Sequence, residues 1–187
     1  SAQLYDISGD KMQMILDYPT IGEPHYAQIV AADLIKDKSV KIFKINENKN
    51  PYVAMGEKET KVVREGKQVH VYMTAIRSHL TPDNIEGIKM GDEVYFHVTN
   101  LEQDWDVPHG FAIKGAANAE LLVMPGETVT LKWMPDRVGI FPMYCTDFCS
   151  ALHQEMSGYV RVSPAGSNVP LLFSTGTNQP KASAEAK

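Results

Sequence analysis

The sequence contains little of what would direct a protein to a membrane, a nucleic acid or a disulfide scaffold. No apolar run in its 187 residues approaches the ~20 residues that a membrane helix needs. The formal net charge of −5 argues against nucleic acids and anionic membrane surfaces as partners. Only two cysteines are present. No signal peptide is evident and the first residue is Ser1 rather than Met, so we expect a mature or excised product.

Both cysteines lie in one short stretch together with a histidine and a methionine. The run from Cys145 to Met156 reads CTDFCSALHQEM, with the spacing C-x3-C-x3-H-x2-M. Thiolate and thioether sulfurs, combined with imidazole, favour copper over magnesium, calcium or manganese. The run therefore predicts a copper site.

Other uses of these residues stay open at this point. Two cysteines in an exported protein most often form a disulfide, although residues four apart pair only where the loop turns back sharply. Zinc would need a second pair of ligands, and methionine is a poor zinc ligand. A mononuclear copper site would use His109, Cys149, His153 and Met156 and would leave Cys145 without a role. A site with two coppers accounts for both thiols.

The middle of the chain alternates apolar and polar residues, as strands with one buried face do. This pattern covers residues 68–76, 93–100, 127–134 and 158–163, with turn-forming Gly, Pro and Asp between the segments. Short strands at this spacing predict an antiparallel sandwich. The ligand run directly precedes the last strand and His109 lies at the end of an earlier one, so we expect these ligands to meet at one end of the sandwich.

The two ends of the chain differ from this middle part. Residues 1–56 lack the strand pattern and predict an irregular extension. Residues 165–187 are rich in small and polar residues and predict a flexible tail, in which only 171–173 are apolar enough to dock. We therefore expect the sandwich domain to occupy residues 57–164.

Two sequence segments carry a resemblance to a known family. The ligand run, read with Asp106-Val-Pro-His109-Gly-Phe111, resembles the binuclear copper A site, and residues 93–164 resemble the C-terminal domain of nitrous-oxide reductase. The segment YPTIGEPHYAQ at residues 18–28 is similar to the end of the propeller and the linker of that enzyme. The resemblance implies an all-β, cupredoxin-like Greek-key sandwich. Cytochrome c oxidase subunit 2 has the same copper site but carries membrane helices before it.

The resemblance also implies a complete ligand set. It consists of two bridging thiolates, two capping imidazoles, one weak axial thioether and one backbone carbonyl: Cys145, Cys149, His109, His153, Met156 and Asp147. The second ring nitrogen of His109 should meet an acceptor, for which Glu102, Asp104 and Asp106 are candidates. His25 would be at most one ligand of the catalytic copper cluster in the intact enzyme.

The function implied is electron transfer within a periplasmic oxidoreductase of denitrification. The domain would take electrons from a cytochrome c or a small cupredoxin and pass them to the copper cluster that reduces nitrous oxide to dinitrogen. The intact enzyme would be a homodimer, and this chain alone would lack the catalytic-cluster domain. The alternatives are a copper A domain like that of oxidase subunit 2 and a periplasmic copper-binding or storage protein.

Two further expectations concern the surface. His70 and His97 fall on the polar faces of their strands, and we expect both to be solvated. Phe148, Ala151 and Leu152 are candidates for an apolar docking patch on the ligand run.

Overall fold

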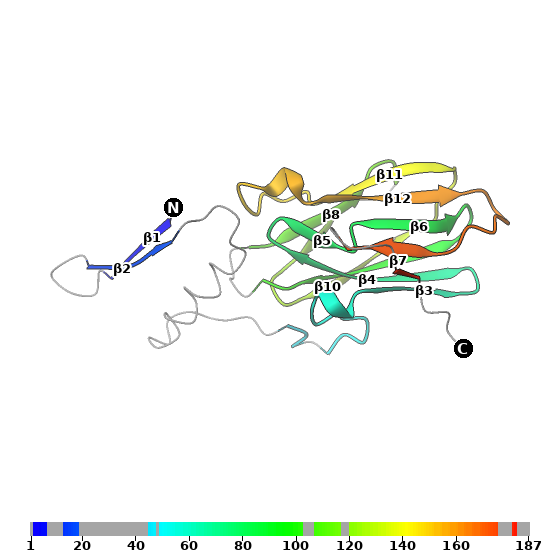
Figure 1. Ribbon diagram of the computed structural model, residues 1–187. Coiled ribbons are helices and arrows are strands. Elements are labelled where there is room, and N and C mark those ends of the chain that lie inside the picture. The colour runs from blue at the N-terminus through cyan, green and yellow to red at the C-terminus, as the bar shows by residue number, and fades with distance from the viewer. Residues whose placement is uncertain are drawn as a thin grey trace. The chain divides into compact units, whose positions relative to one another are not determined.

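The computed structural model describes residues 2–6, 13–18, 45–47, 49–102, 107–116, 120–175 and 181–182. The chain forms two compact units, residues 1–42 and 43–187. In the first unit, β1 (Ala2–Asp6) and β2 (Gln13–Tyr18) form an antiparallel hairpin. The second unit is a β-sandwich (Figure 1). Within the described ranges, no helix is both long and apolar enough to cross a membrane.

The first sheet of the sandwich has the strand order β10-β7-β4-β3, and β5 pairs with β4 beside it. Its strands are β3 (Lys61–Glu65), β4 (Gln68–Ile76), β5 (His79–Thr81), β7 (Glu93–Asn100) and β10 (Thr128–Trp133). The alternation in the sequence decides which side chains point inward. Val94, Phe96 and Val98 of β7 are fully buried, while Glu93 and Tyr95 lie on the outer face.

The second sheet has the strand order β14-β13-β6-β12-β11-β8-β9. Its strands are β6 (Asn84–Lys89), β8 (His109–Ile113), β9 (Leu121–Val123), β11 (Gly139–Tyr144), β12 (Ser157–Ser163), β13 (Leu172–Ser174) and β14 (Lys181–Ala182). Two short 3-10 turns accompany the sheets, η2 (Glu57–Glu59) and η3 (His153–Glu155). Phe111, Phe141 and Met143 from this sheet meet Phe96 and Trp133 from the first one in a single core.

The predicted fold class, a cupredoxin-like Greek-key sandwich, is confirmed, with one difference in strand direction. We expected antiparallel pairing throughout, yet β4 pairs with β7 and β12 pairs with β6 in parallel. Period-two alternation indicates which face of a strand is buried and carries no information about the direction of its neighbour. Here the chain leaves β4 through β5, crosses to β6 in the other sheet, and returns to β7 beside β4.

Segments before residue 57 and after residue 164 also belong to the sandwich. After residue 164, β13 pairs antiparallel with β6, and Leu171 and Phe173 are buried in the core. Before residue 57, Asn50 and Ala54 make hydrogen bonds to the first sheet. The described sandwich therefore runs from the segment before η2 to at least β13.

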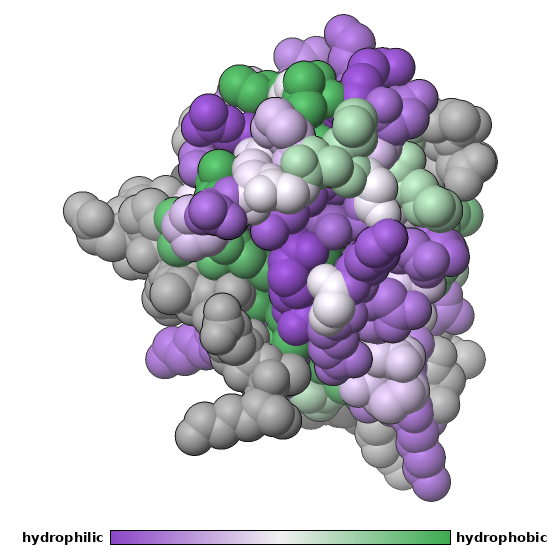
Figure 2. Space-filling view, turned by 90° about the vertical axis from the view of Figure 1, so that its right-hand side faces the viewer, coloured by the Kyte–Doolittle hydropathy of each residue, from purple (hydrophilic) through white to green (hydrophobic). Residues whose placement is uncertain are grey.

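The ligand run lies at one end of the sandwich. It joins β11 to β12 and protrudes from the upper left end of the sandwich in Figure 1. The opposite end is formed by turns such as those between β3 and β4 and between β6 and β7. Figure 2 shows this opposite end, where hydrophilic residues predominate.

Candidate metal centre

Three predicted ligands come together in the interior at the end of the sandwich. The Sγ atoms of Cys145 and Cys149 and a ring nitrogen of His109 all lie within 4.8 Å of one another. His109 begins β8, Cys145 directly follows β11, and both side chains are buried. These two ligands are therefore positioned by adjacent, hydrogen-bonded strands, because β8 pairs with β11.

The remaining ligands approach the two sulfurs from the loop. His153 Nδ1 and Met156 Sδ each lie 3.7 Å from Cys149 Sγ. The backbone oxygen of Asp147 lies 3.3 Å from Cys145 Sγ, and His109 Nδ1 lies 3.9 Å from the same sulfur. Atoms that bind one metal at ~2.0–2.3 Å stand roughly 3–4 Å apart. All six predicted ligands thus lie at separations that suit coordination, and each thiol faces one imidazole.

The loop between β11 and β12 is closed by backbone hydrogen bonds. The Cys145 N–H donates to the Met156 carbonyl oxygen over 3.0 Å, so the first and last ligands of the run are joined directly. Within the loop, the His153 N–H donates to Ser150 O and the Met156 N–H donates to His153 O. These bonds form the turn η3 and direct the His153 ring toward Cys149.

Gly110 allows the loop to approach β8 closely. A Cβ atom at this position would overlap the Thr146 side chain and would come 2.9 Å from the Asp147 backbone nitrogen. Any side chain here would therefore push residues 146 and 147 outward. Because Asp147 offers its carbonyl oxygen beside Cys145, the absence of a side chain at Gly110 bears directly on the ligand geometry.

A buried carboxylate orients His109 from its other side. His109 Nε2 lies 3.4 Å from Glu102 Oε1, and the Glu102 side chain is only 3% exposed. The Arg77 backbone N–H donates to the same oxygen over 2.7 Å, and the Arg77 guanidinium lies 3.9 Å from it. Such a partner fixes the ring so that Nδ1 remains directed at the metal position. Of the three acids considered from sequence, Asp104 and Asp106 lie outside the described residues.

The electrostatics of the centre favour a cation. The Cys149 thiol donates a hydrogen bond to Cys145, which lowers the pKa of Cys145 and raises that of Cys149. Burial disfavours the imidazolium of His109, but bonds to Cys145 and Glu102 outweigh this effect and raise its pKa. One of the two sulfurs is therefore readily deprotonated, and binding of a metal would displace the proton that the pair retains.

The donor set fits copper better than the alternatives considered from sequence. Neither Cys145 nor Cys149 forms a disulfide. Two thiolates, two imidazoles and a thioether are soft ligands, and the thioether is unusual for zinc. A mononuclear site would leave the Cys145 sulfur, with its own imidazole and carbonyl neighbours, outside the coordination sphere.

Some supporting residues were not expected from the sequence. Asn100, at the end of β7, donates to the carbonyl oxygens of Val107 and Val123 and accepts from the Glu102 N–H. It thereby connects the segments on both sides of His109. The sequence offered one signal for this role, because Asn100 is a polar residue at the end of a strand whose alternate residues are apolar. His25, the predicted cluster ligand, lies outside the described residues.

The surface of the loop is apolar where the docking patch was predicted. Phe148 is 79% exposed and Leu152 is 43% exposed, and Ala151 is exposed as well. The Phe148 ring lies 5.8 Å from the His153 ring, centroid to centroid. One apolar side chain therefore links the loop surface to a predicted ligand.

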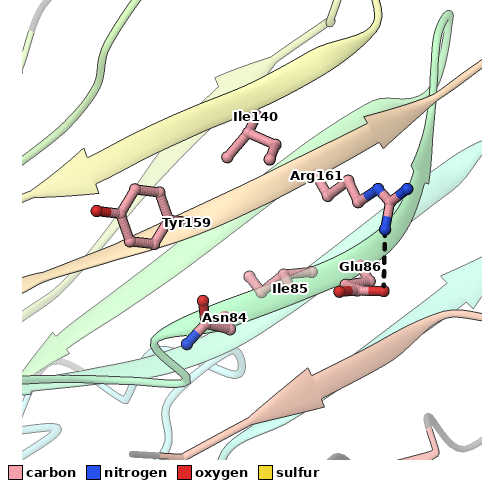
Figure 3. Close-up of a pocket in the computed structure, with 6 residues that line it drawn as sticks. All are labelled: Asn84, Ile85, Glu86, Ile140, Tyr159 and Arg161. Atoms are coloured by element: carbon pink, nitrogen blue, oxygen red, sulfur yellow. Dashed lines mark ion pairs between the residues drawn. The ribbon is translucent and has the colours of Figure 1, made fainter.

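A hollow on the outer face of the second sheet is separate from this centre (Figure 3). An ion pair of 3.9 Å between Arg161 and Glu86 crosses one side of it. None of the predicted ligands lines it; the lining residues are Asn84, Ile85, Glu86, Ile140, Tyr159 and Arg161.

The expectation that His97 is solvated was wrong. Its side chain is only 2% exposed, because the Tyr52 ring stacks on it from the segment before η2. His70 is half-buried beside it. The strand pattern correctly assigned both rings to the outer face, but it contained no information about a cover contributed by a distant part of the chain.

Comparison with known proteins gives similarities to nitrous-oxide reductases and to a cytochrome c oxidase subunit. Residues 1–25 match the family described as nitrous oxide reductase propeller repeat. The nitrous-oxide reductase of Stutzerimonas stutzeri is 36% identical over an alignment of 174 residues, and this alignment covers 87% of this chain and 26% of that protein. That of Cupriavidus necator is 38% identical over 154 residues, 82% of this chain and 23% of that protein.

A shorter similarity covers the sandwich. Cytochrome c oxidase subunit 2 of Thermus thermophilus is 34% identical over 102 residues, which are 54% of this chain and 71% of that protein. The chain thus spans about a quarter of the length of the nitrous-oxide reductases it matches, 26% of one and 23% of the other.

Proposed function

Because this chain belongs to the nitrous-oxide reductase family and carries a copper-binding cupredoxin domain, we propose that its centre holds two coppers and transfers single electrons. The observation that carries the proposal is the pairing of ligands. Each of the two cysteine sulfurs has its own imidazole, at 3.9 Å for Cys145 and His109 and at 3.7 Å for Cys149 and His153. A centre with two metals needs two such halves, whereas a centre with one metal needs only one.

The ligand roles are those that the resemblance implies, and the distances are compatible with them. Cys145 and Cys149 would bridge the two coppers, while His109 and His153 would each cap one end. Met156 Sδ, 3.7 Å from Cys149 Sγ, would be the weak axial ligand on one side. The Asp147 carbonyl oxygen, 3.3 Å from Cys145 Sγ, would take that position on the other side.

The protein around the centre supports fast electron transfer. Two coppers that share one unpaired electron through bridging thiolates each change their geometry little on reduction. The chain adds rigidity, since Glu102 holds His109 and the Cys145–Met156 backbone bond closes the loop. His109, Cys145 and Met156 are buried, so water is largely excluded from their side of the centre. A storage protein would instead need ligands that exchange easily.

The wider role is that of the electron-entry domain of a nitrous-oxide reductase. The donor is a cytochrome c or a small cupredoxin, and the acceptor is the catalytic copper cluster that reduces nitrous oxide in the intact homodimer. His25 is a candidate ligand of that cluster. We infer a periplasmic location, as the resemblance of the copper motif implies. A second candidate, an oxidase subunit 2-like domain, is favoured by the 34% identity to that protein but does not account for the propeller match at residues 1–25.

Copper analysis combined with electron paramagnetic resonance tests this function. We expect two coppers per chain, a purple oxidised state and a seven-line hyperfine pattern, because one electron is shared by two equivalent copper nuclei. One copper per chain with a four-line pattern would refute the binuclear assignment. Two coppers with no transfer of electrons from reduced cytochrome c would instead favour a store.

Replacing Leu152 with glutamate should slow electron delivery from reduced cytochrome c by about tenfold or more, without changing the copper spectrum. The side chain is exposed on the ligand loop, and a charge placed there would be desolvated in an apolar contact. The matched control is Val138→Glu, which introduces the same charge at a 51% exposed residue. Val138 directly precedes β11, at the end of that strand away from the ligand loop. Equal rates for Leu152→Glu and the parent chain, measured by stopped flow, would argue against docking at this loop.

A further inference from the structure

The outer face of the first sheet carries a second cluster of histidines, remote in sequence from every predicted ligand. His70 Nδ1 and His97 Nε2 are hydrogen-bonded over 2.9 Å, and His97 Nδ1 is hydrogen-bonded to Thr130 Oγ1 over 2.7 Å. The Tyr52 ring covers His97 at a centroid distance of 4.2 Å and an interplanar angle of 7°. One buried imidazole is therefore enclosed by a second imidazole, a hydroxyl and a phenol ring.

The two imidazoles meet edge to edge. Their centroids are 5.2 Å apart and their planes differ by only 10°, so the ring nitrogens 2.9 Å apart point at each other. A metal between facing nitrogens would need about 2 Å to each of them, which this gap does not allow. When both rings are neutral, one of the facing nitrogens carries an N–H and the other accepts it. A further proton places a positive charge on the enclosed pair, and its N–H either faces the first across the 2.9 Å gap or points to the Thr130 hydroxyl.

Tyr52 belongs to a short segment that lies across this face, residues 49–54, which we name the strap. Asn50 Nδ2 donates to the Thr128 carbonyl oxygen over 3.2 Å, and the Ala54 N–H donates to Thr99 Oγ1 over 3.3 Å. Between these two anchors, the Tyr52 ring stacks on His97 and lies beside His70 and Tyr72. The strap follows the first unit of the chain, residues 1–42, and leads into the sandwich.

The charged groups around the pair do not compensate for an added proton. Lys61 lies over the Tyr72 ring at 4.5 Å, and Lys132 lies over the Tyr95 ring at 5.3 Å. The facing carboxylate, Glu93, already binds Lys132 over 2.9 Å and accepts from the Tyr95 hydroxyl over 2.8 Å. The other acid on this face, Glu65, is exposed at the end of β3. In the described part of the chain, the ring nitrogens bond only to each other and to Thr130.

We propose that the strap is a proton-sensitive latch, closed by Tyr52 over the histidine pair when both rings are neutral and opened when the pair takes up a further proton. The proposal is independent of the copper assignment. Burial, with a smaller contribution from the charge of His70, lowers the pKa of His97 from 6.5 to about 4. The closed strap therefore excludes a proton that the open strap accepts. The stability of the closed strap relative to the open strap is therefore greatest above pH 6.5. This stability is lost progressively as the pH falls toward about 4.

Hydrogen exchange read by mass spectrometry on the full chain tests the latch between pH 7 and pH 4. Rates are scaled for the pH dependence of unprotected amides, and the central residues of β12 in the other sheet serve as an internal reference. We expect protection of the strap to fall by roughly a hundredfold over this range, while the protection of β12 is unchanged. In His97→Phe, which keeps a ring beneath Tyr52 but removes both nitrogens, strap protection should not depend on pH. The matched control His79→Gln removes an exposed histidine of β5 and should retain the parent profile.

A measurement on the unaltered chain keeps the proposal testable if His97→Phe does not fold. After reduction of bound copper to its diamagnetic state, the ring protons of His97 are titrated by nuclear magnetic resonance. We expect their midpoint well below the ordinary histidine value of 6.5 and coincident with the opening of the strap. A strap equally protected at pH 7 and pH 4, the same loss of protection in His97→Phe, or an ordinary histidine midpoint for His97 would each overturn the latch.

Discussion

In the proposed two-copper centre, replacing Cys149 with serine should reduce the copper content to at most one atom per chain and abolish the expected seven-line spectrum. The Cys149 sulfur lies 3.7 Å from both His153 Nδ1 and Met156 Sδ, so it is the central atom of one half of the centre. A serine hydroxyl is neutral and hard, and it does not bridge two coppers as a thiolate does. Copper analysis and electron paramagnetic resonance of the purified variant provide the measurement, and Cys145→Ser should give the same result.

The matched control is Met156→Leu, which removes the other sulfur at a similar depth. Both side chains belong to the core cluster or pack against it, and leucine preserves most of the methionine volume. Because the axial thioether binds weakly, this variant should keep both coppers and the shared electron while its reduction potential shifts. The assigned roles would be wrong if Met156→Leu emptied the centre while Cys149→Ser kept the seven-line pattern.

Substituting Gly110 by alanine should destabilise the sandwich by about 1–3 kcal/mol and weaken copper retention. The added methyl group would overlap the Thr146 side chain and would press against the Asp147 nitrogen. The loop must then move outward, which withdraws the Asp147 carbonyl oxygen from Cys145. Denaturant unfolding of the copper-free chain measures the first effect, and dialysis against a chelator measures the second.

Two further variants separate the close approach at Gly110 from a general effect of losing a glycine. A methyl group added at Gly56 would meet no atom within 4 Å, and the backbone there is extended, so Gly56→Ala should leave stability and copper unchanged. Adding Thr146→Gly to Gly110→Ala removes the overlapping side chain and should restore part of the copper retention. If the double variant were no better than Gly110→Ala, the collision with Thr146 would not be the cause.

Many of the strand positions and most of the predicted ligands could be identified from the sequence. The expected segments 68–76 and 93–100 coincide with β4 and β7, because their alternation is regular and ends at turn residues. The ligand run was identifiable because its residue types are chemically unusual and lie close together in the chain. His109, far from the run, was found only through the motif around it.

Other features depend on contacts that no local pattern encodes. The parallel pairs β4–β7 and β12–β6 follow from the path of the chain between sheets. The support of His109 by Glu102 and Arg77 joins three separate strands or loops. His97 alternates as a solvated residue would, yet it is buried beneath the distant Tyr52 and beside His70 and Thr130.

The backbone hydrogen bond between Cys145 and Met156 has a consequence for how related proteins can diverge in sequence. Since the two ends of the ligand loop are joined to each other, residues 146–155 form a closed insert, which the sheets constrain where Thr146 meets Gly110 and where Cys149 packs against the core. Substitutions, insertions or deletions inside it can alter the number and type of bound metals while the scaffold is inherited unchanged. Among proteins with this sandwich, the sequences of the strands should therefore report relatedness. The sequence of the insert should report differences in redox chemistry.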